Sequence, residues 1–345
     1  MKRLNETDIN RINELHSIYA KEIPLFIKEI TEIKEMQRLK NVGQNCGRDY
    51  ISNEIQTFEY NYSRLDHSIG VSLIIWNFTK SMKQSIAGLL HDIATPTFSH
   101  VIDYYNNDDE KQVSTECLTP NIIKNSKELE IILSKYGLNV EDVIDYSVYP
   151  IADNNMPQLS ADRLEYNLYM ATSRKLIDMN EARNIYQNIQ IVKNENNEDE
   201  MCFTDIKLAK KFSEIALSNG IYMSGDVSTI TNKLLSDILK LSVKEKVLKP
   251  QMFMDNTEED VVYILENSKN LKVKKMWDKF KNFNKIDETN ELITEKYSIK
   301  ATGKKRYINP LIKIENNIYR ITELDNDVKC KIIKFKEREN LYYSI

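Results

Sequence analysis

The sequence has little of what an all-β or disulfide-bonded protein needs. Its 345 residues include only 8 glycines and 7 prolines, too few for the many tight turns of an all-β fold. The four cysteines, Cys46, Cys117, Cys202 and Cys330, are far apart and form no CxxC pair. Neither a zinc ribbon nor a disulfide framework is therefore indicated. A mostly α protein is the first expectation.

The chain also lacks long apolar runs and a strong excess of charge of one sign. Its longest apolar stretches, such as residues 71–78, are much shorter than the roughly 20 residues of a membrane helix. The first residues show no apolar segment typical of a secretory signal. Lys and Arg number 48 against 52 Asp and Glu, a net charge of −4. We therefore expect a cytoplasmic protein with no membrane partner and no general nucleic-acid surface.

Helical spacing of apolar residues is clearest in the first half of the chain. Leu65, Ile69, Leu73 and Trp76 recur at intervals of four, four and three residues, which places them on one helical face. Residues 61–105 are therefore predicted to form consecutive helices. Further helices are predicted over residues 120–146, 160–178, where Ser160 is the expected N-cap, and 206–248.

Two later segments show the patterns of strands. Residues 185–205 contain two short apolar runs around the acidic turn 194–200, which predicts a β-hairpin. Apolar residues alternate again over 304–324. We therefore predict a helical domain over 1–184, with its motifs at about 35–180, followed by accessory helices, the hairpin and a C-terminal α/β subdomain over 185–345.

Histidine is scarce, and three of the four histidines lie within 34 residues of one another. His67 and His91 fall on successive predicted helices, Asp92 follows His91 directly, and Asp162 lies on a later helix. Two imidazoles with two carboxylates suit a divalent transition metal (Mn, Fe, Zn or Ni), and Mg is also compatible. The spacing alone fits an ordinary helix-end histidine equally well.

Four segments around these residues occur in order along the chain. They are EMQRLKNVGQNCG (35–47), SRLDHSIGV (63–71), AGLLHDIATPTFSH (87–100) and SADRLEY (160–166). Together they resemble the HD-domain metal-dependent phosphohydrolases, and most closely the deoxynucleoside-triphosphate triphosphohydrolase branch, which includes dGTPase and the SAM-and-HD-domain enzyme. The resemblance covers about residues 30–325 and implies an HD-domain helical bundle, a nucleotide or related phosphoester substrate, and a homo-oligomer.

The resemblance also implies a role for each matching position. His67, His91, Asp92 and Asp162 match the metal ligands, and Asp92 could also serve as a partial base. The remaining matches are Arg64 and Arg163 for phosphate, His100 facing the phosphates, Tyr166 packing on the sugar, Gln44 reading a sugar hydroxyl, and Gln37 with Lys40 at an interface or effector site. Arg64, Gln37 and Lys40 also fit ordinary surface positions, and Tyr166 fits a plain core position.

The departures from the family pattern leave two functions open. Thr95 and Thr115 stand where the branch has histidines, and Met170 stands where it has a sugar-reading aspartate. A threonine hydroxyl cannot exchange a proton at neutral pH as an imidazole can. The first function is metal-dependent hydrolysis of a nucleotide or related phosphoester, of which dNTP triphosphohydrolysis is one form. The second is a catalytically weakened HD-domain protein that binds a nucleotide as a regulatory module.

Overall fold

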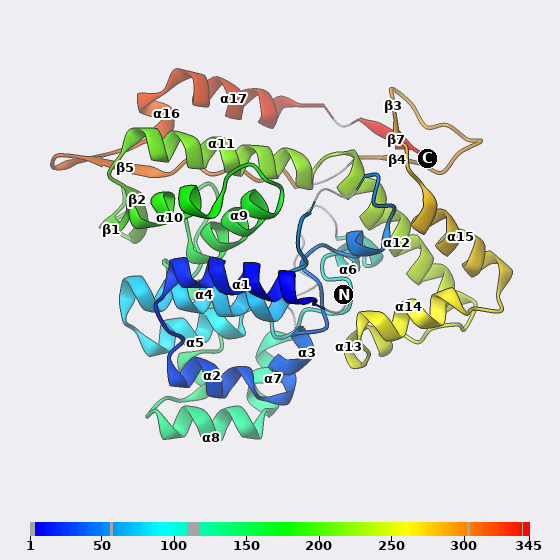
Figure 1. Ribbon diagram of the computed structural model, residues 1–345, viewed down its shortest axis with the longest axis horizontal. Coiled ribbons are helices and arrows are strands. Elements are labelled where there is room, and N and C mark those ends of the chain that lie inside the picture. The colour runs from blue at the N-terminus through cyan, green and yellow to red at the C-terminus, as the bar shows by residue number, and fades with distance from the viewer. Residues whose placement is uncertain (1–3, 56–57, 109–117, 302–303, 340) are drawn as a thin grey trace.

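The first half of the described chain is helical. The structure is a computed structural model that describes residues 4–55, 58–108, 118–301, 304–339 and 341–345, so Thr115 and Cys117 lie outside it. The helices of this half (Figure 1) are α1 (Glu6–Tyr19), α2 (Leu25–Thr31), α3 (Lys34–Leu39), α4 (Arg64–Thr79), α5 (Met82–Leu90), α6 (Val101–Tyr105), α7 (Thr119–Asn125), α8 (Lys127–Lys135), α9 (Ala161–Ser173) and α10 (Met179–Gln187).

The second half combines helices with short strands. No helix in the described ranges is both long and apolar enough to cross a membrane. The elements are β1 (Ile189–Lys193), β2 (Asp199–Phe203), α11 (Ile206–Met223), α12 (Asp226–Lys244), α13 (Met252–Asp255), α14 (Glu258–Glu266), α15 (Leu271–Asn282), β3 (Asp287–Thr289), β4 (Ser298–Lys300), β5 (Leu311–Ile314), β6 (Asn317–Arg320), α16 (Ile321–Leu324), α17 (Asn326–Glu337) and β7 (Tyr342–Ser344).

Helices α4 and α5 form the centre of the first half. A reciprocal cap starts α4, because the Ser63 side chain accepts from the Asp66 backbone N–H and the Asp66 carboxylate accepts from that of Ser63. The two helices approach closely at Gly88, where an added Cβ would lie 2.2 Å from the Ile75 Cδ1 atom. This contact brings the start of α4 and the end of α5 to the same region, and α1 and α9 pack against α4 as well.

Helix α9 begins as the sequence predicts. The Ser160 side chain accepts from the Arg163 backbone N–H, which confirms Ser160 as the N-cap. The helix packs on α4 at Gly70, where an added Cβ would lie 2.8 Å from the Glu165 side chain. Only glycine leaves room there for a buried carboxylate between the two helices.

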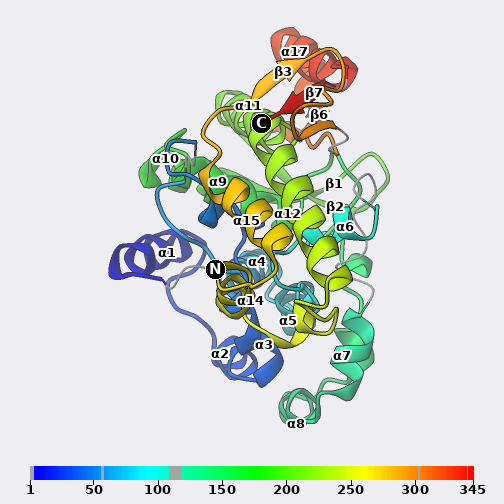
Figure 2. The same ribbon diagram turned by 90° about the vertical axis from the view of Figure 1, so that its right-hand side faces the viewer.

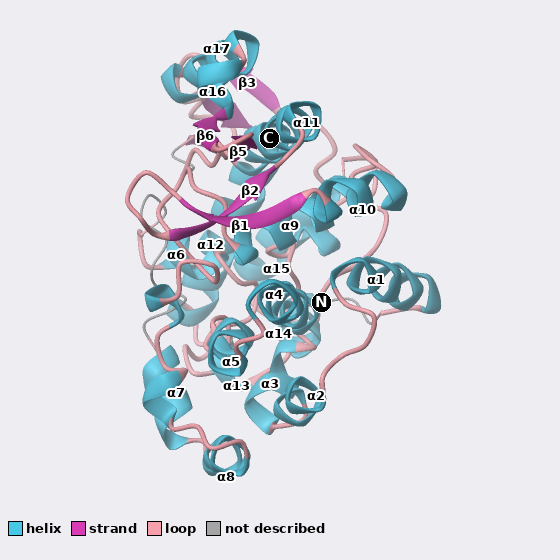
Figure 3. Ribbon diagram, turned by 90° about the vertical axis from the view of Figure 1, so that its left-hand side faces the viewer, coloured by secondary structure: helices cyan, strands magenta, loops and turns pink. Residues whose placement is uncertain are grey.

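Two small sheets lie in the half of the molecule away from α2, α7 and α8 (Figure 3). The predicted hairpin is confirmed, since β1 pairs antiparallel with β2 and Ile189 lies opposite Phe203. The first sheet has the order β1-β2-β5-β6, in which β2 and β5 are parallel. The second sheet, β3-β7-β4, places the strand Tyr342–Ser344 between two strands from earlier in the chain. The mostly α prediction is confirmed, with these strands added to the helical bundle.

Helix α12 begins after a break that the sequence pattern does not predict. The helical region predicted over 206–248 is confirmed as two helices, because α11 ends at Met223 and Gly225 is the N-cap of α12. An added Cβ at Gly225 would lie 2.9 Å from the Ile221 carbonyl oxygen, so the turn requires glycine. Beyond the break, α12 packs beside α15 (Figure 2).

The buried apolar residues form two clusters. The first joins α1–α5 and α7–α11 to the first sheet, α16 and α17. The second joins α12–α15 and the second sheet to Cys46, Ile51, Phe98 and Val101. Residues on both sides of position 184 therefore contribute to both clusters, and the division of the chain at that position stays a prediction.

Candidate metal centre

One cavity of about 240 Å³ contains all the residues predicted for metal, phosphate and sugar. It is lined by residues from the loop before α4, from α4, from the end of α5 and from α9. The predicted residues on its wall are Gln44, Arg64, His67, His91, Asp92, His100, Asp162, Arg163 and Tyr166.

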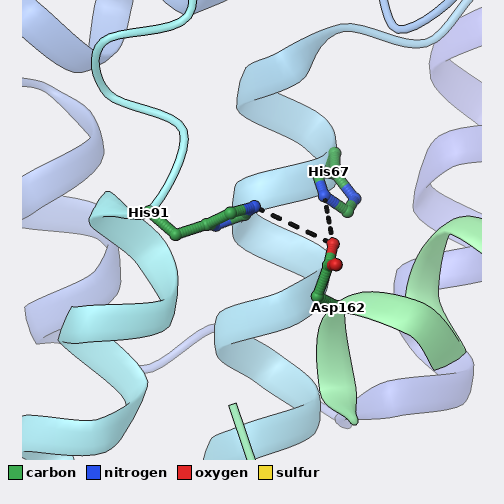
Figure 4. Close-up of side chains that lie close together, drawn as sticks. All are labelled: His67, His91 and Asp162. Atoms are coloured by element: carbon green, nitrogen blue, oxygen red, sulfur yellow. Dashed lines mark ion pairs between the residues drawn. The ribbon is translucent and has the colours of Figure 1, made fainter. Parts of the chain in front are cut away.

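Three of the predicted metal ligands converge on one point of this wall. His67 lies in the first turn of α4, His91 is the C-cap of α5, and Asp162 lies in the first turn of α9. The Oδ1 atom of Asp162 is 3.1 Å from the Nε2 atom of His67 and 3.9 Å from that of His91 (Figure 4). The three donor atoms lie within 4.8 Å of one another, close enough to share one ion.

The contacts of the two imidazole rings fit a metal between them. The Nδ1 atom of His67 lies 2.5 Å from the Glu165 carboxylate, and the Nδ1 atom of His91 lies 2.7 Å from the Gly88 carbonyl oxygen. These partners accept from Nδ1, so each Nδ1 carries a proton and each Nε2 is the ring atom that a metal would contact, which at His67 requires displacing a second proton. Metal-binding histidines in proteins are held in this way. The residues present therefore fit a divalent metal.

A buried chain of hydrogen bonds continues from His67, and sequence reasoning missed it. The Tyr62 hydroxyl donates to the second oxygen of Glu165 (2.6 Å), and His16 donates from Nε2 to Tyr62 (3.0 Å) and to the Asp66 carbonyl oxygen (3.1 Å). Glu165 is fully buried. A signal for Glu165 exists in the sequence, because it follows Asp162 by three residues and lies next to it on the α9 surface.

The carboxylates around His67 give the site an excess of negative charge. Burial lowers the pKa of His67, but the charges of Glu165 and Asp162 outweigh burial and raise that pKa to about 10. Burial raises the pKa of Asp162, whereas its contacts with His67 bring the net value down to about 2. Asp162 thus stays ionised at neutral pH, and a divalent cation would compete with the proton on His67.

Asp92 lies beside the three converging donors, with both of its oxygens engaged. Oδ1 accepts from the Thr95 hydroxyl (2.9 Å) and Oδ2 accepts from Nη1 of Arg64 (2.8 Å). Oδ2 is also 3.6 Å from Nε2 of His91. Burial raises the pKa of Asp92, but Arg64 and the two histidines lower it well below its usual range. The assignment of Asp92 as fourth ligand stays a prediction.

The loop that carries Asp92 is tied to α3. Nη2 of Arg38 donates to the carbonyl oxygens of Ile93 (3.0 Å) and Thr95 (2.7 Å). The Arg38 guanidinium thus fixes the backbone on which the Thr95 hydroxyl is carried. Thr95, which stands where the triphosphohydrolase branch has a histidine, therefore orients the Asp92 carboxylate.

The two arginines predicted to bind phosphate are both held by other protein groups. Arg64 is buried and uses Nε to donate to the Ser99 hydroxyl (3.0 Å) in addition to its contact with Asp92. Arg163 pairs with Asp153 (3.1 Å) and donates to the side chain and carbonyl oxygen of Asn154. Both line the cavity, so their charge reaches a ligand there, while their phosphate-binding roles stay predictions.

The remaining predicted residues also line the cavity. His100 lies 2.9 Å from an Asp103 carboxylate oxygen, and burial lowers its pKa, so its ring is neutral at pH 7 with Nε2 as acceptor. Burial raises the pKa of the Tyr166 hydroxyl. Sequence reasoning did not identify several other residues of this wall, among them Asn45, Arg48, Phe58, Tyr169, Asn232 and Arg306.

The chain is similar to known proteins over most of its length. It is 28% identical over 249 residues to the uncharacterized protein YdhJ of Bacillus subtilis (strain 168), covering 72% of this chain and 73% of YdhJ. It is 26% identical over 187 residues to the metal-dependent phosphohydrolase cns2 of Cordyceps militaris, covering 54% of this chain and 52% of cns2.

A solved structure shares the fold. The crystal structure of the phosphohydrolase BT4208 from Bacteroides thetaiotaomicron VPI-5482 superposes with a TM-score of 0.65 at 15% identity, over 94% of this chain and 96% of that one. Residues 64–164, which contain the three converging donors, match the HD domain. HD domains bind divalent metals. The matches therefore identify an HD domain at residues 64–164 and support a metal-dependent phosphohydrolase, whose substrate they leave open.

Proposed function

We propose that this protein hydrolyses a phosphoester bond of a nucleotide or a related compound, with a divalent transition metal held by His67, His91, Asp92 and Asp162. The observation that carries this proposal is the pair of histidines with fixed Nδ1 protons, whose Nε2 atoms both face the Asp162 carboxylate. That arrangement lies in the wall of a cavity and not in the closed core.

The side chains of this wall would each contribute to hydrolysis. A divalent metal, when bound, lowers the pKa of the attacking water and polarises a phosphoryl oxygen. Arg64 neutralises Asp92 and adds positive charge next to the phosphate, where charge stabilisation gives most of the help to phosphoryl transfer. His100 is neutral, so its Nε2 atom can accept a proton.

Triphosphohydrolysis of dNTPs is the narrower form of the proposal. Gln44 and Tyr166 support it because both line the cavity, at positions implied to bind the sugar. Thr95 and Met170 weigh against it. The Thr95 hydroxyl is committed to Asp92, and Met170 offers no acceptor to a sugar hydroxyl where it lines the cavity. We expect Thr95→His to raise dNTP turnover relative to other substrates if this branch is the right one.

Assembly into a homo-oligomer is a separate part of the proposal. Lys40 is exposed at the C-cap of α3, whereas Gln37 donates to the Thr31 carbonyl oxygen (2.6 Å). Lys40 is thus the better placed of the two to meet a partner. Light scattering on wild type and Lys40→Glu tests this, and a wild-type monomer at all concentrations contradicts it.

The test of the main proposal is a release assay on a panel of substrates. Phosphomonoesters, nucleotides and dNTPs are each incubated with protein loaded with Mn, Fe, Zn, Ni or Mg, and phosphate and triphosphate release are measured. Metal-dependent release from at least one substrate supports the proposal. Tight nucleotide binding by calorimetry, with no release under any metal, contradicts it and favours the regulatory function.

A further inference from the structure

Arg48 is a buried cation for which the fold supplies no anion. It lines the cavity and is 6% exposed. In the part of the chain that the structure describes, its guanidinium pairs with no carboxylate, and its buried Nε atom has no hydrogen-bond partner. Buried charges in proteins are almost always paired, so an unpaired one that faces a cavity indicates a missing ligand.

The neighbours of Arg48 hold the guanidinium in place without satisfying it. Its Cζ atom lies 5.9 Å from the ring centre of Phe58 and 5.6 Å from that of Tyr222. Aromatic faces attract a cation but leave its planar fork of N–H groups open. The adjacent acid, Asp49, instead accepts from the Asn45 amide (3.0 Å), and burial raises the pKa of its carboxyl.

The backbone that carries Arg48 is rigidly placed. Gly47 has φ +77°, a left-handed conformation, and an added Cβ would lie 2.5 Å from the Leu235 side chain on α12. The Asn45 side chain accepts from the Tyr169 hydroxyl (3.1 Å). The loop is thus fixed to α12 on one side and to α9 on the other, so Arg48 is positioned before any ligand arrives.

Two further buried polar atoms on the same wall have no partner in the described structure. These are Oε1 of Gln44 and Oδ1 of Asn232, which is 6% exposed. Asn232 precedes Leu235 by three residues on α12, so it lies on the side of the helix that meets the Gly47 turn. The wall of the cavity thus has one cationic donor, Arg48, and two neutral acceptors, Gln44 and Asn232, that lack a hydrogen-bond partner in the described structure.

Helix α9 gives the separation of the two ends. Asp162, at the metal centre, and Tyr169, which holds the Arg48 loop through Asn45, are seven residues apart on this helix. At 1.5 Å per residue this is about 10 Å along the helix axis. Since Arg48 and the metal ligands line the same cavity, one elongated molecule bound there can contact both.

We propose that Arg48 and Asn232 form a second subsite that binds an anionic group on the alcohol part of the substrate. The substrate is then a phosphoester with two separated anions, such as a nucleoside bisphosphate, of which only the one at the metal centre is hydrolysed. Asn232 accepts from a hydroxyl or amino group beside the second anion. This inference rests on the proposed function for the position of the scissile phosphate.

The kinetic test compares substrates that differ only in the second anion. The first pair is adenosine 5′-monophosphate and adenosine 3′,5′-bisphosphate, and the second pair is glycerol 3-phosphate and 3-phosphoglycerate. We expect wild type to prefer the second member of at least one pair in kcat/KM. A preference within the first pair identifies a phosphate at Arg48, and one within the second pair identifies a carboxylate. No preference in either pair overturns the proposal.

The variants are Arg48→Met and, as a matched control, Arg174→Met. Arg174 packs on the same Tyr222 ring, 4.4 Å from its centre, but does not line the cavity. Loss of a charged hydrogen-bonding partner should reduce the preference in Arg48→Met by about ten- to a hundredfold. Arg174→Met should keep the wild-type ratio. An unchanged ratio in Arg48→Met overturns the proposal.

A binding measurement separates this inference from the proposed function. Calorimetry with adenosine 3′,5′-bisphosphate on chelator-treated protein requires no hydrolysis. Weaker binding to Arg48→Met than to wild type and Arg174→Met supports the subsite even if no phosphoester is turned over. Equal binding by all three proteins overturns it even if hydrolysis is observed. Circular dichroism of each variant shows whether it is folded.

Discussion

Two buried arginines mark the two ends of the cavity, and they differ in one respect. Arg64 is 4% exposed and pairs with Asp92 at 2.8 Å, whereas Arg48 is 6% exposed and pairs with no carboxylate of the described chain. At the metal end the side chains satisfy one another, apart from the donor atoms that face a cation. At the Arg48 end, the Nε atom of Arg48 and the amide oxygens of Gln44 and Asn232 have no hydrogen-bond partner among the described residues. This difference fits the proposed roles of the two ends, which are to hold a metal ion at the first and to bind an anionic group of the substrate at the second.

The largest effect is expected from a substitution at the metal centre. Asp162→Ala removes the carboxylate that both Nε2 atoms face, so we expect loss of bound metal and loss of all detectable phosphoester hydrolysis. Elemental analysis and the release assay measure the two effects. The control is Asp327→Ala, which removes an exposed carboxylate on α17. Full metal content in Asp162→Ala would contradict the ligand assignment.

The second prediction tests the comparison itself. Arg64→Met leaves the buried Asp92 carboxylate unpaired, which should lower the free energy of unfolding by about 3–5 kcal/mol. Arg48→Met removes a charge that has no partner, so it should leave the free energy of unfolding unchanged or raise it.

Urea unfolding of Arg64→Met and Arg48→Met, in chelator and without any anionic ligand, measures the two free energies of unfolding. Methionine replaces arginine in each, so the comparison is matched in side-chain length. Equal destabilisation by the two substitutions would show that Arg48 has a partner after all.

The third prediction concerns the carboxylate behind His67. Glu165→Gln removes the charge that fixes the Nδ1 proton, so metal affinity should fall by about ten- to a hundredfold. Calorimetric metal titration measures this. Tyr62→Phe is the graded control, because it removes only the hydrogen bond to Glu165 and should reduce affinity less. An unchanged metal affinity in Glu165→Gln would show that Glu165 contributes packing and not metal binding.

The last prediction is a pH dependence of stability at His16. Burial lowers the pKa of His16 to about 4 in the folded protein, against 6.5 when unfolded. Below pH 6.5 the unfolded chain therefore binds a proton that the folded protein does not. The contribution of His16 is complete above pH 6.5 and is lost as the pH falls towards 4, by about 1.4 kcal/mol per pH unit.

Urea unfolding of wild type and His16→Gln between pH 4 and 8 isolates this slope, because all other titrating groups are common to both. The difference in the free energy of unfolding between the two proteins should change below pH 6.5 and stay constant above it. A constant difference over the whole range would contradict a neutral, buried His16.

Local signals explain which parts of the fold the sequence predicts. The helices around His67 and Asp162 follow from apolar spacing and from the Ser63 and Ser160 caps, and the β1–β2 hairpin follows from two apolar runs around a polar turn. The break at Gly225 is missed because apolar periodicity continues on both sides of it. The β3-β7-β4 sheet is missed because its strands have only three residues and pair across more than 40 positions of the chain.

The candidate site also contains residues that the sequence predicts and one that it does not. His67, His91 and Asp162 lie in short motifs, so their meeting could be expected from the resemblance. Arg48 carries no such signal, because what distinguishes it is that no carboxylate of the described chain pairs with it, and that depends on how α9, α12 and the loop before α4 come together. A missing partner is a tertiary property that a single sequence does not show.

The double hydrogen bond from Arg38 has a mechanical consequence. One guanidinium nitrogen of Arg38 donates to the carbonyl oxygens of both Ile93 and Thr95, so α3 is connected directly to the loop that carries Asp92. Lys40, two residues further along the chain, lies exposed at the end of that helix. A displacement of α3 would therefore move the backbone of the loop that carries Asp92, and with it the Thr95 hydroxyl that donates to the Asp92 carboxylate.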